Sequence, residues 1–200
     1  MKSDPLYVEA LATFDRLLMA SRGGRTTGSA TMFLATATKS GLPSLRTVLL
    51  REHNERGFVF YTRLMGRKGG ELVKNPNAAL LFRWSRVEGG VQIRIEGTVT
   101  QVDDAEADAN FALLDRRSKT DAWATQQSHP LASREALDLK IAEAVAHFDK
   151  QEVPRPPDWT GFRVAPNHIE IWHARNRRFP ERWVYSRAKN GHWSKQLLFP

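Results

Sequence analysis

The 200-residue chain has 41% hydrophobic and 26% charged residues, the composition of a globular protein long enough to bury a hydrophobic core. It contains no cysteine, which excludes disulfide bonds, thiolate metal sites and a cysteine nucleophile. No run of about 18 apolar residues could span a membrane, and the N-terminus lacks an apolar secretory signal. We therefore expect a cytoplasmic protein with no membrane partner.

The formal net charge of +8 favours anionic ligands. Lysines and arginines are spread over both halves of the chain, and the densest cluster lies in residues 175–195. Because the charge forms no basic arm and no nucleic-acid reader motif is present, we expect no nucleic-acid partner.

The first predicted element is a helix. Asp4 and Pro5 have the pattern of an N-cap followed by proline at the first helical position, and apolar residues recur at helical spacing to about Met19. The glycine-rich stretch 21–29 breaks the helix. Residues 1–30 are thus predicted to form a helix and a loop.

Short β-rich runs follow at 31–38, 45–51, 58–62, 78–84 and 91–102. The connections "KSGLPS" and "EHNERG" carry the glycine, proline and asparagine typical of tight turns. Because most of these strands follow one another without a helix between them, they predict an antiparallel sheet or small barrel.

Three helices are predicted to interrupt the strands, at 66–75, 103–114 and 133–150. In the last, Ser133 is the expected cap, and one stripe holds Leu137, Ile141, Val145 and Phe148. A proline-rich connector (152–159) leads to late strands at 161–166, 168–172, 182–187 and near 192–198. With no repeat and no dividing linker, we predict one α+β domain over residues 1–200.

The helix at 66–75 carries the first chemical signal. Arg67 and Lys68 lie in its first turn, where the helix dipole disfavours cations. Free backbone N–H groups beside two cations are typical of a phosphate site, although a solvated surface pair explains this stretch equally well. Arg46 and Arg51 flank an apolar strand. Because they are separated by an odd number of positions, their side chains are predicted to lie on opposite faces of the strand. Ordinary strand-end charges are the simpler interpretation of this pair.

Known catalytic motifs are missing, since no GxGxxG, Walker A, HExxH or GxSxG sequence occurs. The six histidines have no metal-ligand spacing, so we expect no metal site. Gln127 and Ser128 could contact a polar ring or a phosphate, or could simply be loop polarity. A bound cofactor that carries the chemistry is therefore a serious option.

Nine segments, in order along the chain, resemble the pyridoxamine 5′-phosphate oxidase family. They are "RTVLLR", "GFVFYT", "GRKGGEL", "NPNAALLFRW", "VQIRIEG", "AWATQQS", "EVPRPPDWTGFRV", "IEIW" and "RWVY". The resemblance implies an FMN-binding split β-barrel with flanking helices, assembled as a homodimer with FMN at the subunit interface. Residues 160–200 would complete the flavin site.

The resemblance also implies a set of FMN-binding residues. Carried over by position, these are Arg46, Thr47, Val48, Leu49, Leu50, Arg51, Tyr61, Thr62, Arg67, Lys68, Gln92, Gln127, Ser128, Trp172 and Arg182. Arg46, Arg67 and Lys68 would hold the FMN phosphate. Its negative charge would explain why two cations lie in the first turn of the helix at 66–75.

In the family's reaction the substrate stacks on the flavin and C4′ gives up a hydride, after which molecular oxygen reoxidises the flavin. The resemblance implies Arg178 as the catalytic arginine near C4′. It implies a substrate site at Arg51, Asn110, Ser118 and Arg178.

Four positions depart from the family's substrate site. The family has a lysine where this chain has Arg51, a tyrosine at Asn110, an arginine at Leu114 and a histidine at Pro180. Arg116 or Arg117 could replace the lost phosphate contact.

Two enzyme hypotheses follow. The first is an FMN-dependent oxidase that converts pyridoxine or pyridoxamine 5′-phosphate to pyridoxal 5′-phosphate with oxygen. The second is a paralogous FMN oxidase acting on another small anionic ring, such as a phenazine-like one. A flavin-binding protein without turnover is the non-enzymatic alternative.

Overall fold

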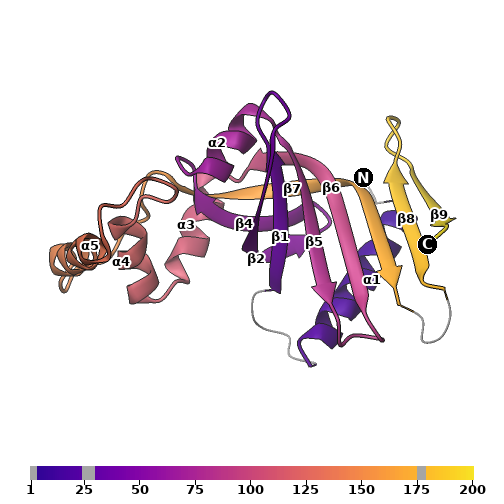
Figure 1. The fold of residues 1–200 in the computed structure, drawn as a ribbon, viewed down its shortest axis with the longest axis horizontal. Helices are drawn as coiled ribbons and strands as arrows, with labels where there is room; N and C mark the ends of the chain where they lie inside the picture. Colours follow the sequence, from indigo (N-terminus) through magenta and orange to yellow (C-terminus); the bar gives the residue numbers. More distant parts are fainter. Residues whose placement is uncertain (1–3, 24–29, 175–178) are drawn as a thin grey trace.

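The computed structural model describes residues 4–23, 30–174 and 179–200 (Figure 1). Its elements, in chain order, are α1 (Pro5–Ser21), β1 (Ala30–Ala37), β2 (Pro43–Leu50), β3 (Glu52–Asn54), β4 (Gly57–Arg63), α2 (Arg67–Lys74), β5 (Asn77–Trp84), β6 (Val91–Gln101), α3 (Asp104–Ala112), α4 (Arg116–Ala124), α5 (Arg134–His147), β7 (Trp159–His173), β8 (Glu181–Arg187) and β9 (Trp193–Leu198). None of these helices is long and apolar enough to cross a membrane.

The strands form one antiparallel sheet in the order β2-β1-β5-β6-β7-β4-β3, and β8 and β9 extend it from β7. The sheet curls until β2 comes to lie against β4, which makes a half-barrel. β7 is the longest strand, and β6 pairs with it along almost its whole length. On the other edge of β7, β4 pairs with residues 159–164 and β8 with residues 168–173.

A bulge separates these two halves of β7. Glu96 pairs with His168 and Gly97 with Pro166, so one residue of β7 is left over between them. The neighbouring backbones come so close here that a Cβ on Gly57 would lie 2.2 Å from the Val164 carbonyl oxygen. A Cβ on Gly97 would lie 2.0 Å from that of Ala165. Only glycine fits at both positions.

The main core lies between α1 and the sheet. Asp4 caps α1 by accepting a hydrogen bond from the Leu6 N–H (2.9 Å). Phe14 is buried and packs edge-on against Phe58 and Phe82, with ring centroids 5.0 Å apart in both pairs. A smaller core under α3 contains Val59, Val102, Ala107, Phe111 and Trp159.

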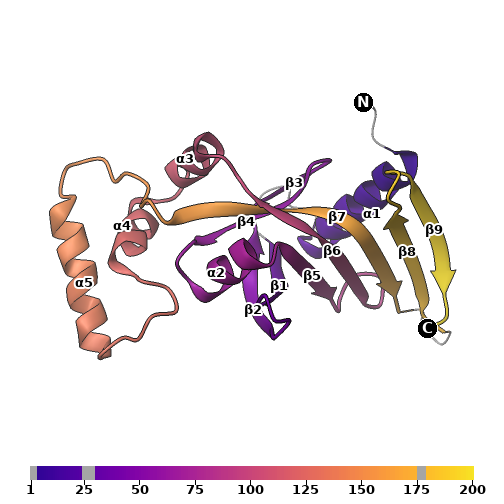
Figure 2. The same ribbon diagram turned by 90° about the horizontal axis from the view of Figure 1, so that it is seen from above.

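Helices α4 and α5 lie at one end of the molecule, and β8 and β9 lie at the other (Figures 1 and 2). This arrangement explains a difference from the sequence prediction. The apolar stripe of 133–150 does not face a core: α5 has no buried residue, and only Phe148, just past its end, is buried. Ser133 does cap α5, accepting from the Ala136 N–H at 3.2 Å.

The predicted α+β class and the split β-barrel fold with flanking helices are confirmed. Two local predictions were wrong, and one helix was not predicted. The strands 161–166 and 168–172 are a single bulged strand, β7. The turn "EHNERG" contains β3, which is held by pairing with β4. The segment 116–124 forms α4, whose N-cap Asp115 accepts from the Ser118 N–H at 2.6 Å.

The close approach at the bulge predicts a strong effect of one methyl group. Gly97→Ala should lower the free energy of unfolding by about 2–3 kcal/mol, because the added Cβ overlaps a backbone oxygen that cannot move alone. Gly70→Ala is the matched control: its Cβ meets nothing within 4 Å, and alanine in a helix gains about 0.5–1 kcal/mol. Urea unfolding at fixed protein concentration measures both. A Gly97→Ala variant as stable as Gly70→Ala would contradict the close packing at the bulge.

Candidate functional site

A cavity of about 310 Å³ opens where β2, β4 and the first turn of α2 meet. Its walls combine predicted cofactor and substrate residues with apolar side chains. The lining residues are Thr47, Val48, Leu49, Arg51, Tyr61, Thr62, Lys68, Leu114, Ser118, Gln127 and Trp159. Segments up to about 110 positions apart in the chain are brought together because β2 curls against β4 and the loop after α4 returns to α2.

Lys68 is the buried cation of this cavity. Its residue is only 8% exposed, and its Nζ donates to Thr62 Oγ1 (3.1 Å) and Gln127 Oε1 (2.6 Å). Both partners are neutral, so no carboxylate among the described residues balances the ammonium. Burial lowers the pKa of Lys68, and the nearby charge of Arg46 lowers it further. An anion beside Lys68 would remove this penalty.

The start of α2 adds free backbone donors. The N-cap is Gly66, which has no side chain to bond the first N–H groups, so these amides are available to a ligand. The Arg67 side chain is 59% exposed and donates from Nε to Glu71 Oε1 at 2.9 Å. It lines a second cavity of about 600 Å³ between α2 and the turn that joins β1 to β2. Amides and cations together make this end of α2 suited to a phosphate.

Glu71 anchors the neighbouring arginine. Its Oε2 accepts from Thr36 and Ser44 (both 2.5 Å) and from Arg46 Nη2 (3.3 Å). Arg46 also donates to the Leu34 carbonyl oxygen at 3.2 Å. Burial alone would raise the pKa of Glu71, but the hydrogen bonds from Ser44, Thr36, Arg67 and Arg46 outweigh it and lower the pKa to about 2. Arg46 is therefore fixed next to Lys68.

Tyr61 and Trp159 form an aromatic wall. Their rings stack with centroids 4.8 Å apart and planes 14° from parallel, and Phe111 packs edge-on against Trp159. The Tyr61 hydroxyl is buried and has no hydrogen-bond partner within the described part of the chain. Burial raises the pKa of Tyr61 to about 12, with a further contribution from Glu106. Trp159 was not among the predicted site residues, although it lies in the segment EVPRPPDWTGFRV, because the sequence does not show that it stacks on Tyr61.

The predicted substrate residues divide into two groups. Arg51, Ser118 and Leu114 line the cavity, whereas Asn110 on α3 does not. Arg116 donates to the carbonyl oxygens of Phe148 and Gln151, so it ties α4 to the end of α5. Arg117 is 92% exposed and lies 3.9 Å from Asp121. Neither arginine lines the cavity. Arg178, predicted as catalytic, lies outside the described residues.

Two predicted cofactor residues, Leu50 and Ser128, are notable for core packing and for backbone conformation, respectively. Leu50 points into the main core. Ser128 has a positive φ of 70°, a conformation that non-glycine residues rarely adopt and that often marks functional loops. It follows Gln127, which holds Lys68.

The remaining predicted cofactor residues form a separate row. Gln92, Trp172 and Arg182 are direct cross-strand neighbours on β6, β7 and β8. Arg182 pairs with Glu170 through two bonds of 2.9 and 3.0 Å, and Arg83 lies over the Trp172 ring. Tyr61 pairs with Gly161 of the same strand β7. Residues 161 and 172 are thus up to about 36 Å apart along an extended strand, and the row does not line the β2–β4 cavity.

Comparisons with known proteins agree with this geometry. Residues 25–148 match the family model described as pyridoxamine 5′-phosphate oxidase. Residues 159–200 match the model described as the pyridoxine 5′-phosphate oxidase C-terminal dimerisation region.

Relatives are similar over the whole chain. A pyridoxine/pyridoxamine 5′-phosphate oxidase of Xylella fastidiosa strain Temecula1 is 48% identical over 196 residues, covering 98% of this chain and 94% of that protein. One from Sphingopyxis alaskensis is 49% identical over 200 residues, covering 100% of this chain and 89% of that protein.

Two solved structures share the fold. PhzG from Burkholderia lata 383, in complex with tetrahydrophenazine-1-carboxylic acid, aligns with a TM-score of 0.87 and 30% identity, covering 100% of this chain and 94% of that one. A pyridoxamine 5′-phosphate oxidase-related, FMN binding protein from Nostoc punctiforme PCC 73102 aligns with a TM-score of 0.73 and 19% identity, covering 94% and 96%. The latter supports the fold alone.

The Glu71 network predicts a pH dependence of stability. With a pKa of about 2 in the folded protein and about 4.3 when unfolded, Glu71 stabilises the fold above pH 4.3. That contribution, up to about 3 kcal/mol, is lost as the pH falls toward 2. Urea unfolding from pH 6 to pH 2 should therefore show a shallower pH dependence for Glu71→Gln than for the wild type. Parallel curves for the two proteins would mean that Glu71 does not hold a depressed pKa.

Proposed function

The chain belongs to the pyridoxamine 5′-phosphate oxidase family, and we propose that it is an FMN-dependent oxidase of pyridoxine or pyridoxamine 5′-phosphate. The product would be pyridoxal 5′-phosphate, with oxygen as the electron acceptor. The observation that carries the proposal is the cavity in which buried Lys68 meets the uncapped start of α2. Full-length relatives near 48% identity that carry this oxidase name support the substrate. The cytoplasmic location stays a prediction.

The residues present fit FMN. Arg46, Arg67, Lys68 and the first amides of α2 would hold its phosphate. Gln127 keeps Lys68 in place by accepting a hydrogen bond from its Nζ. Thr47, Val48 and Leu49 of β2, with Tyr61, Thr62 and Gln127, would line the ring. The bound flavin supplies a two-electron acceptor, which no side chain of this chain provides.

A homodimer would complete the site. Gln92, Trp172 and Arg182 lie too far along β7 to join the cavity of their own chain, so we infer that they reach the flavin bound by a second copy. Two features support this. Residues 159–200 match a dimerisation region, and Phe33, Leu45 (67% exposed) and Leu49 leave an apolar face open on β1 and β2. Apolar surface of this kind is typical of subunit interfaces.

On the substrate side, Arg51 and Ser118 would bind the anionic group, because both line the cavity and Arg51 is a permanent cation. The Tyr61–Trp159 pair would fix the plane of an aromatic ring and exclude water. Arg178 stays proposed as the catalytic arginine near C4′.

A second candidate function rests on Leu114. An apolar side chain lines the cavity where the family has an arginine, and PhzG, which is 30% identical, was solved with a ring carboxylic acid rather than a phosphate ester. An oxidase acting on such a ring is the alternative.

The phosphate assignment predicts the effect of one arginine. Arg67→Ala should weaken FMN binding by about tenfold to a hundredfold, since one charge-assisted hydrogen bond contributes about 1.5–3 kcal/mol. Lys74→Ala, which removes a cation from the last turn of the same helix, should bind FMN like the wild type. Quenching of flavin fluorescence measures both affinities. Equal affinities for the two variants would remove Arg67 from the phosphate site.

The substrate assignment predicts the outcome of an anaerobic reaction. Mixing FMN-loaded protein with pyridoxine 5′-phosphate should bleach the visible flavin absorbance. Leu114→Arg should lower the concentration needed for half-maximal bleaching by about tenfold, because it restores a charged partner for the phosphate. A protein that stays yellow with this substrate but is bleached by a reduced ring carboxylate would favour the second candidate. A protein bleached by neither would be a flavin binder without turnover.

A further inference from the structure

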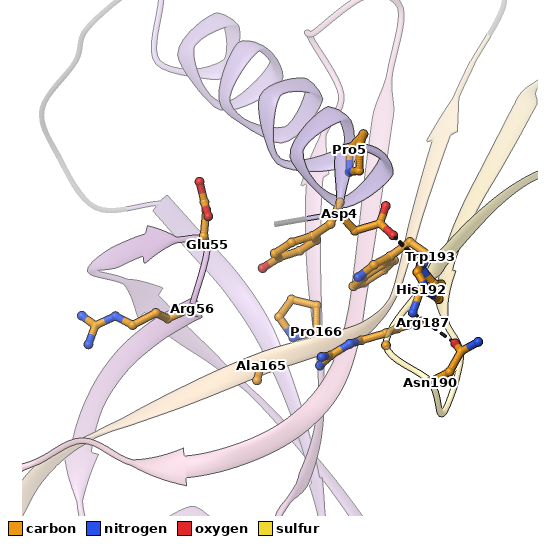
Figure 3. Close-up of a pocket in the computed structure, with 12 residues that line it drawn as sticks. Asp4, Pro5, Glu55, Arg56, Ala165, Pro166, Arg187, Asn190, His192 and Trp193 are labelled. Carbon is orange, nitrogen blue, oxygen red and sulfur yellow. Dashed lines mark hydrogen bonds and ion pairs between the residues drawn. The ribbon is translucent and has the colours of Figure 1, made fainter. Parts of the chain in front are cut away.

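A third cavity, of about 740 Å³, lies outside the proposed flavin site (Figure 3). Four segments surround it: the start of α1, the turn between β3 and β4, the bulge of β7 and the β8–β9 hairpin. Its lining shares no residue with the β2–β4 cavity. The volume is in the range typical of small-molecule sites.

The floor and one wall of this cavity are rigid. Ala165 and Pro166 form the floor at the β7 bulge, where Gly57 and Gly97 allow the neighbouring strands to close in. On the wall, the rings of Tyr7 and Trp193 stack with centroids 4.8 Å apart and planes 11° from parallel. Asp4 fixes this wall by accepting from the Trp193 N–H at 3.1 Å. The cavity therefore offers flat apolar surfaces of a kind that bind planar rings.

Two polar groups of the cavity have no partner among the described residues. Tyr7 is only 7% exposed, and its hydroxyl makes no hydrogen bond. An unpaired buried hydroxyl is costly unless something bonds it. Arg187 sits directly opposite Trp193 in the β8–β9 ladder and extends toward Pro166 (Figure 3). Arg187 is exposed, and no hydrogen bond or ion pair holds its guanidinium within the described part of the chain.

The charges around Tyr7 are consistent with this arrangement. Burial and, to a smaller extent, the charge of Glu55 together raise the pKa of Tyr7 to about 12, and Arg187 opposes the rise. Glu55 and Arg56 stand together on the β3–β4 turn, across the cavity from the β8–β9 hairpin (Figure 3). Arg56 lies 4.0 Å from Glu106, at the limit of an ion pair, so Arg187 is the cation best placed to receive an anion.

We propose that this cavity binds a small aromatic oxyanion, a single ring that carries a carboxylate or a phosphate. The ring would lie against the Tyr7–Trp193 wall above Pro166, and the Arg187 guanidinium would bind the oxyanion. The Tyr7 hydroxyl would donate to an acceptor of the ligand. The site is independent of the flavin cavity and does not rest on the proposed function.

Calorimetric titration of FMN-saturated protein tests the site with three probes: phenyl phosphate, benzoate and inorganic phosphate. We expect at least one of the two ring compounds to bind more tightly than inorganic phosphate. The tighter of the two shows whether the site prefers a phosphate or a carboxylate. Arg187→Gln should weaken that binding by about tenfold to a hundredfold. Tyr7→Phe should weaken it severalfold without lowering the midpoint of thermal unfolding, because the hydroxyl has no partner to lose in the free protein.

Arg51→Gln is the matched control, since Arg51 lines the other cavity. It should leave the Arg187-dependent binding unchanged. Binding that is lost in Arg51→Gln and kept in Arg187→Gln would place the probe in the flavin cavity and overturn the proposal. The proposal would also be overturned if neither ring compound bound, or if inorganic phosphate bound as tightly as the better ring compound.

Discussion

The architecture depends on how β7 shares its two edges. β6 follows one edge of this strand, while β4 and β8 divide the other at the bulge near Pro166. At that point the backbones of β4 and β6 approach β7 so closely that Gly57 and Gly97 have no room for a Cβ. Because β4 belongs to the curled half-barrel and β8 to the C-terminal hairpin, this junction fixes both parts on one strand. It also places the bulge at the floor of the Tyr7–Trp193 cavity.

The same strand explains why the proposed flavin site needs two copies of the chain. Tyr61 and Thr62 pair with the first residues of β7, whereas Gln92 and Arg182 flank Trp172 near its end. A continuous strand is stiff, so these groups cannot fold back onto each other within one chain. An antiparallel second copy would bring the two ends of β7 together across an interface. The split of the site thus follows from strand length, and the match of residues 159–200 to a dimerisation region agrees with it.

Much of the fold could be predicted from sequence because most strands carry their own apolar pattern and turns. The exceptions have physical reasons. The polar residues of β3 form a strand only because β4 offers a partner, and α4 is a short polar helix whose clearest signal is its cap, Asp115. For Arg67 and Lys68, dipole arguments left a phosphate site and a solvated surface pair equally open, and the family resemblance favoured the phosphate site. The sequence did not predict that Trp159, Tyr7 and Arg187 line cavities, since their neighbours come from distant segments. The tie of Arg116 to the end of α5 likewise depends on tertiary packing.

The cations behind the net charge of +8 differ in whether a carboxylate pairs with them. Arg63 pairs with Asp158 at 2.6 Å, Arg163 with Glu106 at 2.5 Å, and Arg155 with Asp104 and Asp108. These arginines join helices or loops to the sheet, and their charge is already balanced. Lys68 has only neutral oxygen partners despite its burial, and Arg187 has none among the described residues. A buried cation such as Lys68 without a carboxylate is unfavourable in the free protein and is relieved by an anion. Arg187 is exposed, so its guanidinium can exchange bound water for an anion. Lys68 and Arg187 are therefore two cations, each lining a cavity, whose charge no carboxylate of the described residues balances.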